Sequence, residues 1–497
     1  MPVTFNLQTN ADGVATVSVD GRLLYSQYDP HKHAQRWAEK LSLARDTRYV
    51  LLVGDLLGYG AVALRAIRPE LQIIAIKPTT SIAVQSAAEA HTVAGDSPEQ
   101  IRAAVRASIP YHALAAVEAV AWPPAGTVLP QWSEQAERAV IAAVADRRSE
   151  LATTAAFGRL WLHNALCRSL DHQTRSEIQL RAGDLIVVGA GSSLCELTQP
   201  QFANVGVLAA SSAIASLHAI EREPTIALHL DGGRWAQRYL HTIARVVPQV
   251  TVVLGLKASR GPVREPVLIR SGWFGEAVAP DAAEWPYVPE QPSVGLTLLD
   301  LRTRLGCDQP ARTAGLDFCS YDLRSHAGNH HNEQLAASSA SRLAPRYHQL
   351  FERAAGAAQR LPTQWPDGTP AYTTAALDLF RAAFVRSAAA AQPITAVPEL
   401  PRTSGSSGQA APQAVQLERR VVQRPAPRHR SDHAARQLSR WRELLQQREN
   451  NPIADELTLH LAPVEFVRGD VAAARDTAIG ELAVLQRYVA HWAERLG

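Results

Sequence analysis

Glycine, serine and aspartate gather in turns that follow short apolar runs in the middle of the chain. The first such turn, at 189–194, follows the run 185–188. A turn of this composition lets the backbone approach an anion closely, and a helix that begins there offers free N–H groups. We interpret it as a candidate cradle for a phosphate or nucleotide, although such a turn can also be only a tight connection. Its candidate binding residues are Gly189, Gly191, Ser192, Ser193 and Leu194.

Further polar groups stand at equivalent places. Two serines follow the run 205–210, and an aspartate follows the run 225–230. The carboxyl ends of parallel strands meet at one edge of an open α/β sheet, where ligands bind. A later turn that contains serine also precedes a helix, and Asp317 follows that helix. We therefore predict one composite site, which adds the residues Ser211, Ser212, Asp231, Ser293, Val294 and Asp317.

Three histidines lie close together after these turns. His326 and His330 have i, i+4 spacing, and His331 follows them directly. If helical, they could bind a metal ion, although we expect no metal site. The alternatives are a solvated polar stretch, or a His326 that contacts a phosphate or transfers a proton. Arg324 could pair with a phosphate or lie on the surface.

Length and composition restrict the class of protein. The chain has 497 residues, 46% hydrophobic and 20% charged, which predicts two to four globular domains. A net charge of +3 is too balanced to predict a nucleic-acid partner. The four cysteines show no short paired spacing, so we expect reduced thiols and neither a zinc knuckle nor a redox pair. We find no secretory signal and no apolar run that could cross a membrane, and expect a cytoplasmic protein.

The elements that must position the site are predicted to form an α/β fold. Alternating residues near the N-terminus predict an antiparallel meander, and a helix opens at Pro30. The strand 49–53, a glycine-rich turn, a helix and the strand 71–76 read as a Rossmann-like unit. Its glycine spacing departs from the dinucleotide fingerprint, and Lys77 stands where an acid would bind a ribose. We favour a structural role for this unit over cofactor binding.

The chain divides into predicted segments of different character. We expect a helical stretch from 131 to about 170 and strands at 185–188, 205–210, 225–230 and 250–256. A proline-, serine- and arginine-rich stretch favours a linker. The predicted segments are the meander with the Rossmann-like domain at 1–130, a central nucleotide-binding domain at 155–345, a helical extension at 346–391, a linker at 392–430 and a helical C-terminal region at 431–497.

The ordered motifs resemble a known family. Over residues 20–345 the chain resembles the motility accessory factors (Maf glycosyltransferases) and the MptE-like 6-hydroxymethylpterin diphosphokinases. The motifs that carry the resemblance are Tyr28-Asp29-Pro30, VLLVGDLLGYG (50–60), RLWLHNAL (159–166), IVVGAGSSL (186–194), LAASSAIASL (208–217) and the stretch 292–327. The central part also looks like bacterial sialyltransferases, at 189–194, 292–295 and 315–318.

This resemblance implies a central α/β, sialyltransferase-like nucleotide-binding domain. It also implies a nucleotide-sugar donor, CMP-linked and nonulosonic, with flagellin Ser/Thr as the acceptor. Ser193 and the 189–194 backbone would hold the donor phosphate or ribose, and Ser293 would contact the nucleotide. The candidate catalytic residues are Asp317, Tyr321 and His326; Tyr321 or His326 would stabilise the departing phosphate or act as acid and base. No resident cofactor, nucleic acid or membrane partner is implied.

Departures from the family pattern keep two alternatives open. The diphosphokinases hold Mg²⁺ through aspartates that correspond to Ser211 and Thr225 here, so that only Asp231 remains. This loss disfavours a Mg²⁺-dependent diphosphokinase and is compatible with glycosyl transfer without a metal. Ser192 replaces a proline, and Cys319 replaces a tyrosine. These changes leave open a non-catalytic flagellar or envelope assembly factor of the same fold. The sequence does not predict the oligomeric state.

Overall fold

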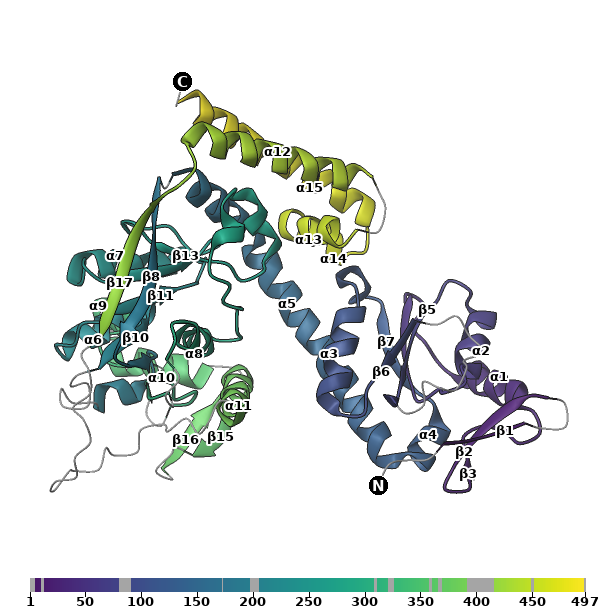
Figure 1. Cartoon of the computed structure of the whole chain (residues 1–497). Coiled ribbons are helices and arrows are strands. Elements are labelled where there is room, and N and C mark those ends of the chain that lie inside the picture. The colour runs from purple at the N-terminus through teal and green to yellow at the C-terminus, as the bar shows by residue number, and fades with distance from the viewer. Residues whose placement is uncertain are drawn as a thin grey trace. The chain divides into compact units, whose positions relative to one another are not determined.

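The computed structural model forms two compact units, shown in Figure 1. One unit comprises residues 1–158 and 441–483, and the other comprises 159–440 and 484–497. Both combine parallel sheets with helices, which confirms the α/β class. The residues that the structure describes are 5–9, 13–79, 91–171, 173–196, 205–307, 311–320, 326–356, 360–364, 369–390, 415–447 and 451–495.

The first unit opens with a small antiparallel sheet in the order β1-β2-β3. Its strands are β1 (Phe5–Thr9), β2 (Ala15–Val19) and β3 (Arg22–Leu23). β2 is nearly fully buried, so this meander contributes to the core. The chain then enters helix α1 (Pro30–Lys40), where Asp29 Oδ1 accepts from Lys32 N at 2.8 Å. This N-cap with Pro30 at the first helical position confirms the predicted helix start.

A four-stranded parallel sheet in the order β6-β5-β4-β7 forms the centre of this unit. Its strands are β4 (Tyr49–Val53), β5 (Gln72–Lys77), β6 (His91–Ala94) and β7 (Val117–Ala121). β4 and β5 are apolar runs whose side chains are almost all buried, as expected for strands covered on both faces. The helical elements along this sheet are α2 (Tyr59–Ile67), α3 (Pro98–Ser108), the 3₁₀ turn η2 (Tyr111–Ala113) and α4 (Pro123–Val128).

A long helix, α5 (Pro130–Asp171), carries residues of both units and confirms the helix predicted from 131 to about 170. The C-terminal region is helical as expected, but residues 441–483 belong to the first unit and the rest to the second. The C-terminal helices are α12 (Pro427–Gln446), α13 (Pro452–Leu461), α14 (Pro463–Val467) and α15 (Val471–Glu494). None of the helices in the described part of the chain has the length and apolar character needed to cross a bilayer.

The second unit is built on an eight-stranded sheet in the order β14-β9-β10-β11-β12-β13-β8-β17. All neighbouring pairs are parallel except β8 with β17. Strands β9 to β13 follow one another across the sheet, whereas β14 returns to the other side of β9. The strand order therefore reverses at β9. The strands are β8 (Thr174–Ala182), β9 (Leu185–Val188), β10 (Gly206–Ala210), β11 (Ile226–His229), β12 (Thr251–Gly255), β13 (Val267–Ile269), β14 (Thr313–Ala314) and β17 (Gln416–Gln423).

The helices of this unit come between the strands, and the buried helix α8 contacts β9, β10 and β11. The described helical segments between β9 and β17 in the sequence belong to this unit. They are η3 (Ser192–Glu196), η5 (Ser211–Ala213), α6 (Ile214–Ala219), η6 (Arg234–Ala236), α7 (Gln237–Val246), η7 (Phe274–Val278), η8 (Ala282–Glu284), α8 (Val294–Arg304), α9 (His331–Ser338), α10 (Arg346–Gly356) and α11 (Ala375–Ala390).

The linker predicted at 392–430 is wrong for its C-terminal part. Residues 416–423 form β17, which pairs antiparallel with β8, and α12 begins at Pro427. Arg424, at the end of this strand, is buried and donates to both oxygens of buried Asp281, at 3.0 and 3.2 Å. Residues 391–414 lie outside the described residues.

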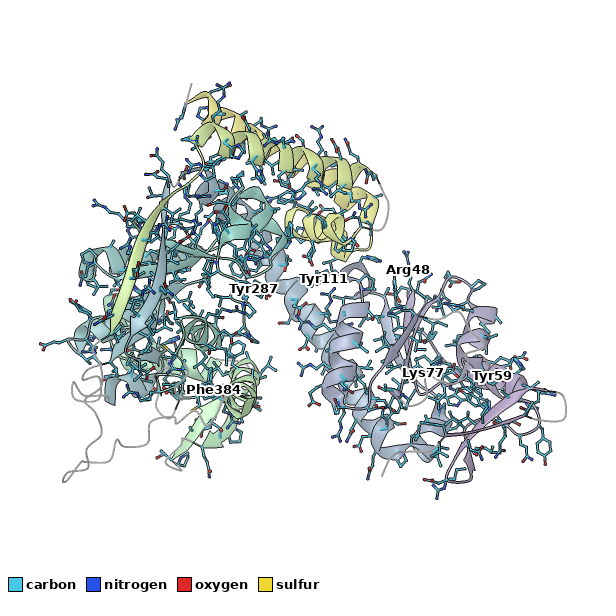
Figure 2. All side chains as sticks on the ribbon, in the orientation of Figure 1. Arg48, Tyr59, Lys77, Tyr111, Tyr287 and Phe384 are labelled. Atoms are coloured by element: carbon cyan, nitrogen blue, oxygen red, sulfur yellow. The ribbon has the colours of Figure 1, made fainter. Side chains whose placement is uncertain are left out.

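The extension predicted as helical at 346–391 contains a hairpin between its helices α10 and α11. Strands β15 (Leu361–Gln364) and β16 (Pro370–Thr373) pair antiparallel. Tyr372 also pairs with Ser320, so this hairpin contacts the segment that follows β14. On α11, Phe384, labelled in Figure 2, has its ring 5.5 Å from that of Phe318.

Candidate functional site

The described turns that carry predicted site residues lie at one edge of the large sheet. Because β9, β10, β11 and β14 are parallel neighbours, the turns that follow them emerge on the same side. The turn 189–194 follows β9 where the strand order reverses. That is the place where open α/β sheets form a ligand crevice. The turns that carry the predicted residues thus lie at the same edge of this sheet, and the composite binding site stays a prediction.

The glycines of the first turn allow two strands to approach closely. Gly189 N donates to Ala314 O at 2.8 Å, and Gly191 N donates to Gly315 O at 2.8 Å. A Cβ on Gly189 would lie 2.3 Å from Gly315 O, and Gly315 itself has φ +62°. These glycines therefore serve the contact between the turns after β9 and β14, whatever ligand binds beside them.

We expect Gly315→Ala to destabilise the second unit by about 2–4 kcal/mol, because it combines overpacking against Gly189 O at 2.5 Å with a left-handed φ. Gly306→Ala is the matched control. Gly306 has φ +87° but nothing within 4 Å of an added Cβ, so it should lose only about 1 kcal/mol. Urea unfolding of both variants checks this. Equal losses of stability in the two variants would show that the close approach of the added Cβ to Gly189 O has no cost of its own.

Asp317 closes the same turn. Its Oδ2 accepts from Ser193 N at 2.9 Å, and its Oδ1 accepts from the Ser193 hydroxyl. The donors expected to hold a phosphate at Ser193 are thus used by a carboxylate of the chain. Ser192 and Leu194 are buried, and the Ser192 hydroxyl has no hydrogen-bond partner in the described structure. A catalytic role for Asp317 stays a prediction.

The later serine turn is placed beside Asp317 by helix packing. Ser293 is the N-cap of α8, and its Oγ accepts from Leu296 N at 3.4 Å. Val294 packs partly buried against the core. A Cβ on Gly295 would lie 2.5 Å from the Leu316 side chain, which also limits Gly189. The N-terminus of α8 therefore lies at the turns that follow β9 and β14.

The histidine segment is anchored to the first turn, because Ala327 N donates to Ala190 O at 2.9 Å. The rings of His326 and His330 stack with their centroids 4.0 Å apart. Burial lowers the pKa of His326. Burial and the two neighbouring histidines lower the pKa of His330 to about 3. Both imidazoles are therefore neutral near pH 7. Tyr321 is the other candidate for stabilising the departing phosphate or acting as acid and base. It lies outside the described residues, as does Arg324.

The structure adds a buried histidine that the sequence analysis missed. Ser211 Oγ lies 2.8 Å from His229 Nδ1, and His229 Nε2 lies 2.8 Å from Ser259 Oγ. His229 is fully buried, and burial together with Arg168 lowers its pKa to about 3. The signal was present, since His229 is the one polar residue of the strand 226–229 and stands at its carboxyl end.

Tyr239 on α7 connects this histidine to the others. Its ring centroid lies 6.5 Å from that of His229 and 5.9 Å from that of His330. Tyr239 Oη lies 3.4 Å from His330 Nε2. Asp231 is exposed and accepts from Gly233 N at 2.7 Å, while Ser212 is half-buried beside Ser211. Ser211, His326 and the first turn are thus brought to one place by contacts far apart in sequence.

The described residues offer poor support for a metal ion. Within the ranges given above, no group of three or more His, Cys, Asp or Glu side chains is arranged to hold one. His330 uses Nδ1 to accept from Asn332 N at 3.2 Å, and His331 Nε2 lies 3.0 Å from Thr242 Oγ1. These nitrogens already have partners, which disfavours the metal alternative for the histidines. Three of the four cysteines, Cys167, Cys307 and Cys319, are free and buried.

The glycine-rich turn of the first unit is filled by its own side chains. The Asp55 carboxylate is fully buried, and its Oδ2 accepts from Ala61 N at 2.9 Å in the first turn of α2. Tyr25 Oη donates to Asp55 Oδ1 at 2.7 Å, and Lys77 Nζ donates to Leu56 O at 2.7 Å (Lys77 and Tyr59 are labelled in Figure 2). The helix N-terminus that would receive a phosphate in a dinucleotide site therefore holds a carboxylate.

Comparisons with known proteins agree with this arrangement. No protein-family model and no curated protein matches the sequence. Among solved structures, a MAf glycosyltransferase from Magnetospirillum magneticum AMB-1 matches with a TM-score of 0.53 at 12% sequence identity. The match covers 99% of this chain and 91% of that chain. The chain therefore shares the fold of a Maf glycosyltransferase, and the resemblance found in the motifs is confirmed at the level of the fold.

Proposed function

We propose that this chain is a Maf-like glycosyltransferase that moves a sugar from a nucleotide-linked donor to a protein acceptor. The observation that carries the proposal is the convergence of separate motif segments at the reversal point of a parallel sheet. This supports the proposal because 99% of the chain shares its fold with a MAf glycosyltransferase. We further propose a CMP-linked nonulosonic sugar as the donor and flagellin Ser/Thr as the acceptor.

The proposed reaction forms a bond between the acceptor hydroxyl oxygen and the anomeric carbon of the sugar. The bond from that carbon to the phosphate oxygen breaks, and CMP leaves with the electron pair. His326 takes the acceptor's proton, a role that fits an imidazole whose pKa is lowered by burial and that is neutral near pH 7. Ser293, the 189–194 turn, Ser211 and Ser212 bind the nucleotide, and Tyr321 stabilises the departing phosphate.

A thermal-shift panel tests this function. Purified protein is heated with CMP, CDP, UDP, GDP or ATP, each with and without Mg²⁺. A ligand that binds only the folded state adds about 2.7 kcal/mol of stability at one hundred times its Kd. We expect CMP to raise the melting midpoint without Mg²⁺. A shift with ATP that requires Mg²⁺ would instead favour the diphosphokinase, and no shift with any nucleotide would favour a non-catalytic assembly factor.

The acceptor is tested in cells. We expect His326→Ala to abolish the mass increase of flagellin that the wild-type protein produces, since the acceptor's proton then has no base. An unchanged flagellin mass shift in the His326→Ala strain would remove His326 from the catalytic assignment.

A further inference from the structure

A buried relay of two serines and a histidine ends at the candidate site. Ser259 is 1% exposed, His229 0% and Ser211 7%, so only Ser211 can reach a ligand. Both outer contacts of the imidazole are 2.8 Å long. The relay connects the interior of the second unit to the carboxyl end of β10. Which groups donate and which accept its hydrogen bonds depends on which nitrogen of His229 carries the proton.

The partners of Ser259 decide that question. Its carbonyl oxygen accepts from Arg168 Nη2 at 2.6 Å, and its N–H donates to Asp231 O at 2.8 Å. Within the described part of the chain, the Ser259 hydroxyl contacts only His229 Nε2. If that nitrogen were protonated, it would donate to Ser259, and the buried hydroxyl proton of Ser259 would have no acceptor. Such a loss costs about 1–3 kcal/mol.

The opposite tautomer satisfies the Ser259 hydroxyl and both ring nitrogens of His229. Ser259 O–H donates to Nε2, and Nδ1–H donates to Ser211 Oγ. The hydroxyl proton of Ser211 is then free to point into the site. Neutral imidazole is required for this arrangement, and the burial of His229 beside Arg168 lowers its pKa to about 3, which keeps it neutral.

We propose that Ser259 and His229 are positioning residues that make Ser211 a dedicated hydrogen-bond donor to an anionic phosphate oxygen of the ligand. This inference rests on the proposed function and deepens it, because it assigns phosphate recognition to Ser211. The amide and hydroxyl of Ser193 cannot serve as readily, since Asp317 already accepts from both.

The same reasoning applies to a second hydroxyl beside the relay. His330 Nδ1 accepts from Asn332 N, so its proton resides on Nε2, which faces Tyr239 Oη at 3.4 Å. Tyr239 then receives a hydrogen bond and keeps its own proton to donate. Each neutral histidine thus leaves its hydroxyl partner with a proton to donate, and such donors suit an anion better than a cation.

The tautomer can be measured on the ligand-free protein. Nitrogen-15 NMR of histidine-labelled protein distinguishes a protonated from an unprotonated ring nitrogen, and the spectrum of His229→Asn identifies the signal among the 17 histidines. We expect a proton on Nδ1 of His229 at pH 7. A proton on Nε2 would overturn the relay without reference to any nucleotide.

Binding of CMP, measured by titration calorimetry, tests the consequence. We expect Ser211→Ala to weaken binding about tenfold, as for one hydrogen bond to a charged group. Ser259→Ala should weaken it several-fold although Ser259 is too buried to touch the ligand. The control is Ser216→Ala, which removes a buried hydroxyl without a hydrogen-bond partner among the described residues and should leave the Kd unchanged.

The outcomes separate the two proposals. If Ser259→Ala binds CMP like the wild type, the relay does not orient Ser211 and the inference fails. If the wild-type protein binds no nucleotide, the proposed function fails and the phosphate assignment fails with it. The NMR result then still decides whether the relay exists.

Discussion

Asp55→Ala should destabilise the first unit by about 3–5 kcal/mol, because a fully buried carboxylate is removed from three neighbours that depend on it. Tyr25 Oη, which accepts from Leu57 N at 2.8 Å, loses the acceptor for its own proton. Ala61 N loses its acceptor at 2.9 Å. Lys77 is 3% exposed, and this burial lowers the pKa of its amine. The charge of Asp55 opposes that shift and favours the protonated form of Lys77. Urea unfolding and hydrogen exchange of β4 and α2 measure the loss.

Asp29→Ala provides the matched control in the same unit. Asp29 also accepts from a backbone N–H at a helix start, at 2.8 Å, but it is exposed. Its loss should cost about 0.5–2 kcal/mol, as for an ordinary N-cap. A cost for Asp55→Ala no larger than that of Asp29→Ala would show that Asp55 is only a helix cap.

Acidification should destabilise the second unit steeply below pH 6.5. His229 and His330 are buried, and in the folded state the pKa of each is about 3 against an ordinary value of 6.5. Between these values the unfolded chain binds protons that the folded chain does not, so stability rises with pH and is lost as pH falls. Each histidine contributes about 1.4 kcal/mol per pH unit to the dependence of the free energy of unfolding on pH. Urea unfolding at pH 7, 6 and 5, with hydrogen exchange of β11, measures the slope.

His330→Gln should flatten that slope by about 1.4 kcal/mol per pH unit, whatever it does to stability at pH 7. His348→Gln, at an exposed position on α10, gives the baseline for losing a histidine side chain. Identical slopes for the wild type and His330→Gln would mean that His330 is protonated in the folded protein. The stacking on His326 and the contact with Tyr239 would then need another account.

Local chemistry made much of the fold predictable. The apolar runs 49–53 and 185–188 are strands with those bounds, since a run that is buried on both faces carries its own signal. Asp29-Pro30 marked the start of α1, and Ser293 marked the start of α8, because an N-cap is an interaction between near neighbours. The sequence by itself thus determined strands β4, β5 and β9 to β12 and the turns that follow them.

The segment at 416–423 shows what local chemistry cannot reveal. Its sequence is polar and largely exposed, so it resembles a linker. Its pairing partner, β8, lies more than two hundred residues away, and Arg424 finds Asp281 at a separation of 143 residues. The stability of such a strand comes from backbone pairing and distant ion pairs, which leave no periodic pattern in the strand's own sequence.

Contacts between residues that are distant in sequence also decided the chemistry of the candidate site. The sequence placed Ser193, Ser211 and Asp317 among the site residues. Only the tertiary structure gave the Ser193 donors to Asp317 and set Ser211 against His229. Residue types and strand ends are properties of the local sequence. Which donors remain for a ligand depends on contacts between strands and turns that are distant in the chain, because a buried polar group takes whichever partner the packed fold brings to it.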